Sequence, residues 1–115
     1  MCGICGCIAT SANDLALENI VVSMSRTLAH RGPDGDGIFV SKAIAFGHRR
    51  LSIIDIEGGF QPMHDDRGYV ITYNGELYNF LEIRQELEKL GEQFKTHSDT
   101  EVLLKAYIRW GKECL

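Results

Sequence analysis

The chain opens with Met1-Cys2-Gly3-Ile4-Cys5-Gly6-Cys7-Ile8-Ala9. From Gly3 to Ala9 this is a short apolar run, which is typical of a buried strand. Side chains alternate between the two faces of a strand, so Cys5 and Cys7 are expected on one face, while Cys2 lies outside that alternation. The first of the three cysteines therefore calls for a different explanation from the other two.

Three cysteines this close together also raise the alternative of a metal site, because Cys-x-x-Cys is a frequent ligand spacing. Such a site needs a second cysteine pair or a Cys/His cluster, and the sequence offers only the distant Cys114 and scattered histidines. We therefore predict no metal in this chain. Cys5 and Cys7 are better explained as small buried hydrophobic residues.

Length and composition narrow the class of protein. A chain of 115 residues is long enough for one core, and 44% hydrophobic and 24% charged residues are ordinary for a globular protein. The net charge is −4 without a Lys/Arg run, so no nucleic-acid partner is expected. The opening apolar run is too short for a membrane span and has no signal-peptide flanks, so we expect no membrane partner and a cytoplasmic location with free thiols.

Three helices are predicted. Ser11 or Asn13 can cap the first, which should stop near His30 before Gly32-Pro33, with an apolar face of Leu17, Ile20, Val21, Met24 and Leu28. The second is expected over residues 80–90, with Phe80, Ile83, Leu87 and Leu90 on one side. The third begins with the capping-box pattern Ser98-Asp99-Thr100-Glu101 and ends at Gly111; its predicted core residues are Val102, Leu103, Ala106, Tyr107 and Trp110.

Further strands are predicted over residues 37–40, 43–48, 51–54 and 69–73, with loops over residues 31–37 and from Gly58 through Met63. Mostly consecutive strands favour antiparallel pairing with helices on the sheet faces, which is an α+β layout. No closing strand follows the third helix. We therefore expect residues 1–115 to be the N-terminal part of an incomplete domain.

Cys2 can be interpreted either as a nucleophile or as a structural residue. Removal of Met1, common before a small residue, would give Cys2 a free α-amine beside its thiol. An N-terminal amine is partly neutral near neutral pH, so it can accept the thiol proton and make the residue its own nucleophile–base pair. The alternative is that Cys2 is merely the second residue of a buried strand.

Asn74-Gly75 also has two interpretations. At the end of an alternating segment, Asn-Gly is a strong hairpin signal. A side-chain amide beside a glycine N–H, however, supplies the hydrogen-bond donors that an oxyanion requires. The sequence leaves both interpretations open.

Arg50 and Asp99 suit the two charged groups of an amino acid. Arg50 can bind a carboxylate through two hydrogen bonds, and Asp99 can neutralise an ammonium group. Each also has a plainer explanation, since Arg50 can be a solvated strand charge and Asp99 lies in the first turn of a capped helix, where a negative charge is favoured.

Taken together, six motifs resemble the class II glutamine amidotransferases, and most of all the glutaminase domain of the glutamine-hydrolysing asparagine synthetases. In chain order they are Met1-Cys2-Gly3-Ile4, His30-Arg31-Gly32-Pro33-Asp34-Gly35, Arg50-Leu51-Ser52-Ile53-Ile54-Asp55, Gln61-Pro62-Met63, Tyr73-Asn74-Gly75-Glu76-Leu77-Tyr78-Asn79 and Ser98-Asp99. Each motif alone is moderately specific, but six in register over nearly the whole chain are highly specific.

The resemblance implies an N-terminal-nucleophile hydrolase fold, an α-β-β-α sandwich of antiparallel sheets. It implies that Cys2 attacks the side-chain amide of glutamine, releasing ammonia and leaving a thioester that water hydrolyses. Asn74 and Gly75 would form the oxyanion hole and touch the substrate. The segment from His30 to Gly37 and Gln61-Pro62 are expected only to shape the pocket.

The resemblance also assigns residues that bind the amino-acid end of glutamine. The carboxylate would be held by Arg50 with the neighbouring backbone, for which we name Leu51, Ile53 and Ile54. The α-amine would meet Glu76 and Asp99.

Beyond this segment the resemblance implies a C-terminal synthetase domain, where ATP and Mg²⁺ would bind; no cofactor is expected in residues 1–115. Ammonia would then serve asparagine synthesis from aspartate, with a homodimer as one conceivable assembly. Two alternatives stay open: a glutaminase serving a sugar phosphate or another carboxylate, and a non-catalytic remnant that binds amino acids.

Overall fold

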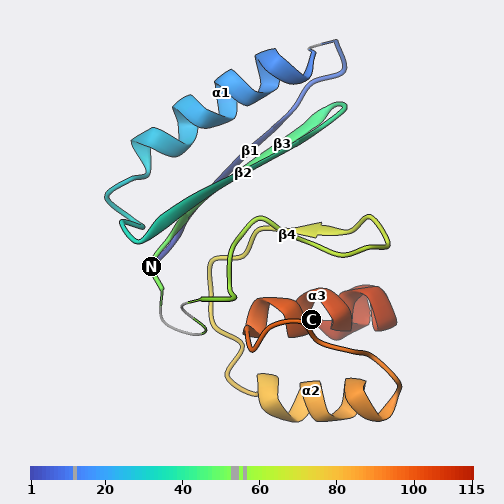
Figure 1. Cartoon of the computed structure of the whole chain (residues 1–115). Helices are drawn as coiled ribbons and strands as arrows, with labels where there is room; N and C mark the ends of the chain where they lie inside the picture. Colours follow the sequence, from blue (N-terminus) through green and yellow to red (C-terminus); the bar gives the residue numbers. More distant parts are fainter. Residues whose placement is uncertain (12, 53–54, 56) are drawn as a thin grey trace. The chain divides into compact units, whose positions relative to one another are not determined.

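The computed structural model describes residues 1–11, 13–52, 55 and 57–115, which form two compact units (Figure 1). The first unit comprises Met1–Ser52, Phe60–Pro62 and Thr72–Gly75, and the second comprises residues 53–59, 63–71 and 76–115. Both sheets are antiparallel, so the predicted α+β class is confirmed.

The first unit is a three-stranded sheet with one helix on one of its faces (Figure 1). Its sheet order is β1-β3-β2, and its elements are β1 (Gly3–Ile8), α1 (Asp14–Thr27), β2 (Gly35–Ser41) and β3 (Ile44–Arg50). Alternation along β3 turns Ala45 and Gly47 towards α1, where Ala45 packs with Leu17 and Val21. His48 and Arg50 consequently lie on the opposite face of the sheet.

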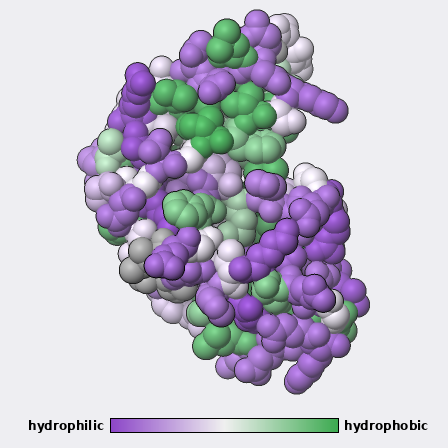
Figure 2. Space-filling view, in the orientation of Figure 1, coloured by the Kyte–Doolittle hydropathy of each residue, from purple (hydrophilic) through white to green (hydrophobic). Residues whose placement is uncertain are grey.

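Helix α1 follows the predicted bounds closely. The side chain of Asn13 accepts a hydrogen bond from the Ala16 N–H at 2.8 Å, which confirms one of the two candidate caps. Of the predicted apolar face, Leu17 is fully buried, but Ile20 and Met24 are 47% and 36% exposed. The narrow sheet covers only the central row of the helix, leaving apolar side chains at the surface around it (Figure 2).

The cysteines of β1 behave as small hydrophobic residues. Cys5 and Cys7 pack against the core beneath α1, as the alternation of the strand predicts. Burial raises the pKa of the Cys5 thiol, which keeps it protonated and inert near neutral pH.

Two strand predictions need correction. Leu51 and Ser52 are irregular rather than the start of a strand, because the Ser52 N–H donates to the Asp34 carboxylate at 2.8 Å instead of to a neighbouring strand; the rest of that predicted strand, Ile53 and Ile54, lies outside the described residues. The predicted strand at 69–73 is only Val70–Ile71 (β5). It pairs with β4 (Met63–His64), whose first residue was expected in a loop.

The second unit combines the β4–β5 hairpin with α2 (Phe80–Lys89), α3 (Asp99–Trp110) and the short 3-10 helix η1 (Gly111–Cys114). Its core is formed by Leu87 with Val102 and Ala106 of α3. Tyr107, predicted to be in the core, is 46% exposed, whereas Leu104 is buried. None of the helices in the described part of the chain is long and apolar enough to cross a membrane.

The start of α3 departs from the predicted capping box. The Ser98 hydroxyl caps the helix by accepting from the Thr100 N–H at 3.1 Å, as expected. The Glu101 carboxylate, however, accepts from the backbone N–H groups of Lys95 at 2.9 Å and Thr96 at 2.7 Å rather than from Ser98. Glu101 therefore fixes the preceding loop, and the Ser98 N–H donates to the Thr96 hydroxyl instead.

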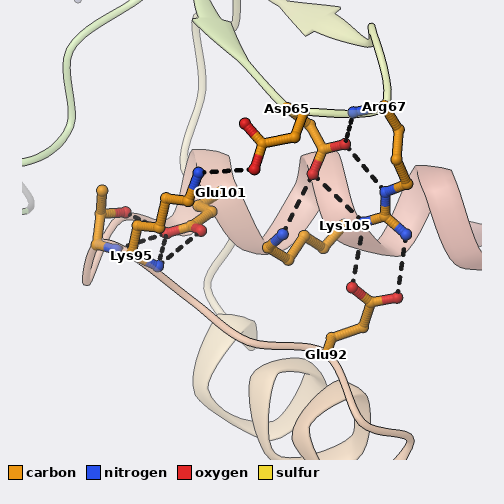
Figure 3. Close-up of polar contacts among 8 residues, drawn as sticks. Asp65, Arg67, Glu92, Lys95, Glu101 and Lys105 are labelled. Atoms are coloured by element: carbon orange, nitrogen blue, oxygen red, sulfur yellow. Dashed lines mark hydrogen bonds and ion pairs between the residues drawn. The ribbon is translucent and has the colours of Figure 1, made fainter.

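A network of charged side chains ties the β4–β5 hairpin to α3 (Figure 3). The Asp65 carboxylate accepts from the Arg67 guanidinium at 2.9 Å and from the Lys105 ammonium at 3.3 Å. Arg67 also donates to Glu92 at 3.1 Å. The side chains of Asp65 and Lys105 are only 9% and 10% exposed, so this part of the network is shielded from solvent.

Candidate active site

The thiol of Cys2 lies against the backbone that follows β3. The register pairs Gly3 with Arg49, and continuing it by one residue brings Cys2 beside the end of that strand. The Leu51 N–H donates to Cys2 Sγ at 3.3 Å, and Sγ lies 3.6 Å from the Leu51 carbonyl oxygen. Met1, whose peptide bond occupies the Cys2 nitrogen, is 71% exposed.

Asp34 fixes the backbone on both sides of Leu51. Its N–H donates to the Arg50 carbonyl at 3.0 Å, and its carboxylate accepts from the Ser52 N–H at 2.8 Å. The loop that carries Asp34 also needs a glycine at position 32, since a Cβ there would lie 2.3 Å from the Arg49 carbonyl carbon. The segment from His30 to Gly37, expected only to shape the pocket, thus positions the peptide group that touches the thiol.

Arg50 is not a solvated strand charge. It is 7% exposed, and its guanidinium carbon lies 5.3 Å from the centre of the Phe60 ring. A buried guanidinium stacked on an aromatic ring is held in a defined orientation, as recognition of a carboxylate requires.

The Asn74-Gly75 dipeptide forms a bend that leads towards α2, so the hairpin interpretation is wrong. Just before it, the Tyr73 N–H donates to the Gln61 side-chain oxygen at 2.5 Å. A Cβ added at position 75 would lie 2.6 Å from the Tyr73 hydroxyl oxygen, so the tyrosine ring or the bend would have to shift. Asn74 is half-buried and Gly75 is exposed.

His48 is a buried histidine on the same face of β3 as Arg50. It is 1% exposed, and its Nδ1 lies 2.9 Å from the Thr72 hydroxyl oxygen. Burial, assisted by the positive charge of Arg50, lowers the pKa of His48 to about 4. The imidazole is therefore neutral near pH 7.

The expected substrate residues fall into both units. Cys2, Arg50, Leu51, Asn74 and Gly75 belong to the first unit, and Cys2 and Leu51 are in direct contact. Glu76 and Asp99 belong to the second unit, where Asp99 is 6% exposed and its carboxylate accepts from the Leu77 N–H at 3.0 Å. Ile53 and Ile54 lie outside the described residues.

The cysteines at the N-terminus do not gather a metal-binding set in the part of the chain that the structure describes. There, no group of three or more His, Cys, Asp or Glu side chains could hold a metal ion. The site instead combines the thiol of Cys2, the backbone N–H of Leu51 and the buried guanidinium of Arg50. This combination suits nucleophilic attack on a substrate that carries a carboxylate.

A family model and several known proteins are similar to this chain over nearly its whole length. The model of the glutamine amidotransferase domain family matches residues 1–115. The chain belongs to this family. Two similar proteins are asparagine synthetase [glutamine-hydrolyzing] 1 and 3 of Bacillus subtilis (strain 168), which are 45% and 43% identical over 98% and 100% of the chain. A third is asparagine synthetase [glutamine-hydrolyzing] 2 of Oryza sativa subsp. japonica, at 38% identity over 98% of the chain.

The amidotransferase domain described here spans only 18–19% of the length of these relatives. The family expected from the sequence is confirmed.

Several residues that support the site were not predicted from the sequence. Gln61 and Asp34 were assigned to loops that only shape the pocket, and His48 and Thr72 were given no role. One signal in the sequence could have drawn attention to His48. It is a polar residue two positions before Arg50, on a strand face where burying an apolar side chain would cost less free energy. Its partner, Thr72, follows from the fold and not from spacing.

Proposed function

We propose that this amidotransferase domain hydrolyses glutamine to glutamate and ammonia with Cys2 as an N-terminal nucleophile. The observation that carries the proposal is the contact between Cys2 Sγ and the Leu51 N–H at 3.3 Å, one residue beyond the buried Arg50. This contact orients the thiol where the backbone and a fixed guanidinium can hold the amino-acid end of the substrate.

The reaction begins once Met1 has been removed. The freed α-amine of Cys2 takes the thiol proton, and the thiolate attacks the side-chain amide carbon of glutamine to form the C–S bond. The ammonium of Cys2 then returns a proton to the leaving nitrogen as the C–N bond breaks, which releases ammonia. Water, deprotonated by the same amine, hydrolyses the γ-glutamyl thioester, releasing glutamate and restoring the thiol.

The other residues stabilise charge. The Asn74 amide and the Gly75 N–H donate to the oxyanion that develops on the amide oxygen. Arg50, with the backbone of Leu51, Ile53 and Ile54, holds the α-carboxylate of glutamine. Glu76 and Asp99 neutralise its α-ammonium group.

The fold proposed for the complete domain is the α-β-β-α sandwich of the N-terminal-nucleophile hydrolases. An antiparallel sheet with α1 on one face, and the nucleophile just before β1, supports this arrangement. Residues outside 1–115 would supply further strands, so this segment would be the N-terminal part of the domain.

We propose further that the ammonia serves an ATP-dependent asparagine synthetase domain, as the names of the relatives suggest. ATP and Mg²⁺ would bind in that domain, and aspartate would accept the nitrogen. A glutaminase with another acceptor is the second candidate, because the roles proposed for these residues concern glutamine and none of them concerns the acceptor.

An electrophilic glutamine analogue tests the nucleophile in the whole enzyme that carries this domain. A diazoketone analogue should label the thiol of Cys2, and Cys5→Ala should be labelled as fast as wild type because Cys5 lies in the strand core. Labelling elsewhere, or Met1 retained on the active protein in an intact-mass measurement, would contradict the mechanism.

Substitution of Cys2 separates chemistry from folding. Cys2→Ala should abolish glutamine-dependent synthesis while synthesis from free ammonia survives. Equal loss of both activities would mean that Cys2 is structural.

A further inference from the structure

His48 is costly to bury where it stands. His48 is 1% exposed. It lies on the face of β3 opposite α1, the same face as Phe46 two residues earlier. Its Nε2 has no hydrogen-bond partner among the described residues. A buried polar group without a partner is destabilising, and an apolar side chain would avoid that cost. The residue therefore needs an explanation, and its other nitrogen supplies one.

That other nitrogen connects two parts of the active site. Nδ1 lies 2.9 Å from the hydroxyl oxygen of Thr72, which is 24 positions further along the chain. Thr72 lies two residues before Asn74. It begins the segment Thr72–Gly75 of the first unit, which carries the proposed oxyanion donors. Two residues after His48 stands Arg50, the proposed carboxylate ligand. One side chain thus links the strand that binds the substrate to the segment that stabilises its reacting amide.

The segment from Thr72 to Gly75 depends on such links, because it lies beyond the end of β5 at Ile71. Two side chains of the first unit hold its start. The Thr72 hydroxyl meets His48, and the Tyr73 N–H donates to Gln61. An oxyanion hole works only if its donors are fixed before the reaction, and small displacements are costly in rate.

We propose that His48 is a positioning residue for glutamine hydrolysis, which holds the oxyanion segment in place through its hydrogen bond to the Thr72 hydroxyl. The inference rests on the proposed function of Cys2. His48 touches neither substrate nor thiol in this role. Its effect is on the transition state, because the oxyanion exists only there.

The sharpest test replaces the hydroxyl and leaves His48 intact. In the whole enzyme, Thr72→Val keeps the shape of the side chain but removes the hydrogen bond, so kcat for glutamine hydrolysis should fall about 3- to 10-fold. KM for glutamine should change little, and synthesis from free ammonia should be unaffected. Thr72→Ser retains the hydroxyl and should restore most of the rate.

Histidine variants test the link from its other end. The amide of His48→Asn reaches the position of Nδ1, whereas that of His48→Gln lies nearer Nε2 and loses Thr72. His48→Gln should therefore slow hydrolysis more than His48→Asn does. The double variant His48→Gln/Thr72→Val should be no slower than the worse single variant, because both changes break one bond.

A matched control removes a hydroxyl elsewhere in the same unit. Thr27 lies at the exposed end of α1, where its hydroxyl donates to the Met24 carbonyl at 2.7 Å. Thr27→Val should leave kcat and KM for glutamine unchanged. Hydrogen exchange of the peptide covering residues 72–75 should be faster in Thr72→Val than in either Thr72→Ser or Thr27→Val.

The outcomes separate this inference from the proposed function. Unchanged hydrolysis by Thr72→Val in a wild-type enzyme that is labelled at Cys2 overturns the role of His48 alone. Equal losses of glutamine-dependent and ammonia-dependent activity, or a change confined to KM, overturn it as well. If wild type and Cys2→Ala do not differ with glutamine, the proposed function fails and the role of His48 falls with it.

Discussion

Cys2 Sγ and the backbone nitrogen of Leu51 lie 3.3 Å apart although 49 positions separate the two residues. The antiparallel pairing of β1 with β3 brings them together, because Gly3 pairs with Arg49. Cys2 lies one position before Gly3, and Leu51 lies two positions after Arg49. The thiol therefore meets a backbone donor whose place is set by the sheet on one side and by Asp34 on the other. The support from Asp34 can be tested by substitution.

Asp34→Ala should loosen the peptide group beside the thiol. The Asp34 carboxylate accepts a hydrogen bond from the Ser52 N–H at 2.8 Å. Because Asp34 is exposed, loss of this hydrogen bond should lower the stability of the local structure by only about 0.5–1.5 kcal/mol. We expect the rate of Cys2 labelling by the diazoketone analogue to fall about 3- to 10-fold in the whole enzyme. Asp36→Ala is the control, because Asp36 only meets Arg49 at 3.7 Å on the surface. Equal labelling rates for the two variants would refute the role of Asp34.

Arg50→Lys should weaken binding of the glutamine carboxylate. Lysine keeps the charge but loses the planar pair of donors and the stacking on Phe60, which lies 5.3 Å from the guanidinium carbon. KM for glutamine should rise about 10-fold or more, while ammonia-dependent synthesis stays constant. The neighbouring Arg49→Lys should not change KM, since Arg49 points to the other face and donates to the Ser25 carbonyl. A normal KM in Arg50→Lys would remove Arg50 from the substrate site.

Gly75→Ala should disturb the oxyanion hole. An added Cβ would lie 2.6 Å from the Tyr73 hydroxyl oxygen and 2.7 Å from the ring carbon that bears it, so the ring or the bend must move. We expect kcat for glutamine hydrolysis to fall about 10- to 100-fold, which corresponds to about 1.4–2.7 kcal/mol of lost transition-state stabilisation. Gly35→Ala is a matched control, because the nearest atom to its added Cβ is 4.0 Å away. Similar kcat values for the two variants would argue against a role for Gly75.

Sequence patterns correctly predicted those features of the domain that depend only on residues close together in the chain. The capped start of α1 at Asn13, the end of α3 at Gly111 and the shared face of Cys5 and Cys7 all follow from neighbours within a few positions. Ile20 lies on the predicted apolar face of α1 but is 47% exposed, because periodicity says nothing about the width of the sheet that covers a helix.

The site shows the same division. The family motifs singled out Cys2 and Arg50 as candidates, and the structure brings Cys2 into contact with the backbone beside Arg50. The supports provided by Asp34 and His48 escaped prediction, because their partners are 18 and 24 positions away and are chosen by strand register and loop path. The glutamate of the capping box was misassigned for a related reason, since the loop before α3 competes for its carboxylate.

Asp65 gives the second unit a stability that depends on pH (Figure 3). The hydrogen bond from the Arg67 guanidinium is the main reason that the pKa of the Asp65 carboxyl lies well below its usual range, and Lys105 adds to the effect against the opposing influence of burial. A carboxyl whose pKa is lowered by folding stabilises the folded state above its ordinary pKa near 4. That stabilisation is lost progressively as the pH falls from there towards the lowered value.

Asp65→Asn should therefore lower the free energy of unfolding at pH 7 by about 2–4 kcal/mol, because Lys105, only 10% exposed, loses its charged partner. The difference from wild type should shrink below pH 4, because there the Asp65 carboxylate of the unfolded wild-type chain takes up a proton while that of the folded protein still does not. Trp110 packs against the core of this unit and is the single tryptophan of the chain, so its fluorescence during urea unfolding reports the transition. Asp66→Asn is the control: its partner Lys95 lies at 3.0 Å, but both side chains are at least 75% exposed, and the loss should stay below about 1 kcal/mol. A difference between Asp65→Asn and wild type that persists undiminished at pH 2 would mean that the asparagine disturbs packing and that the charge of Asp65 is not what stabilises the hairpin against α3.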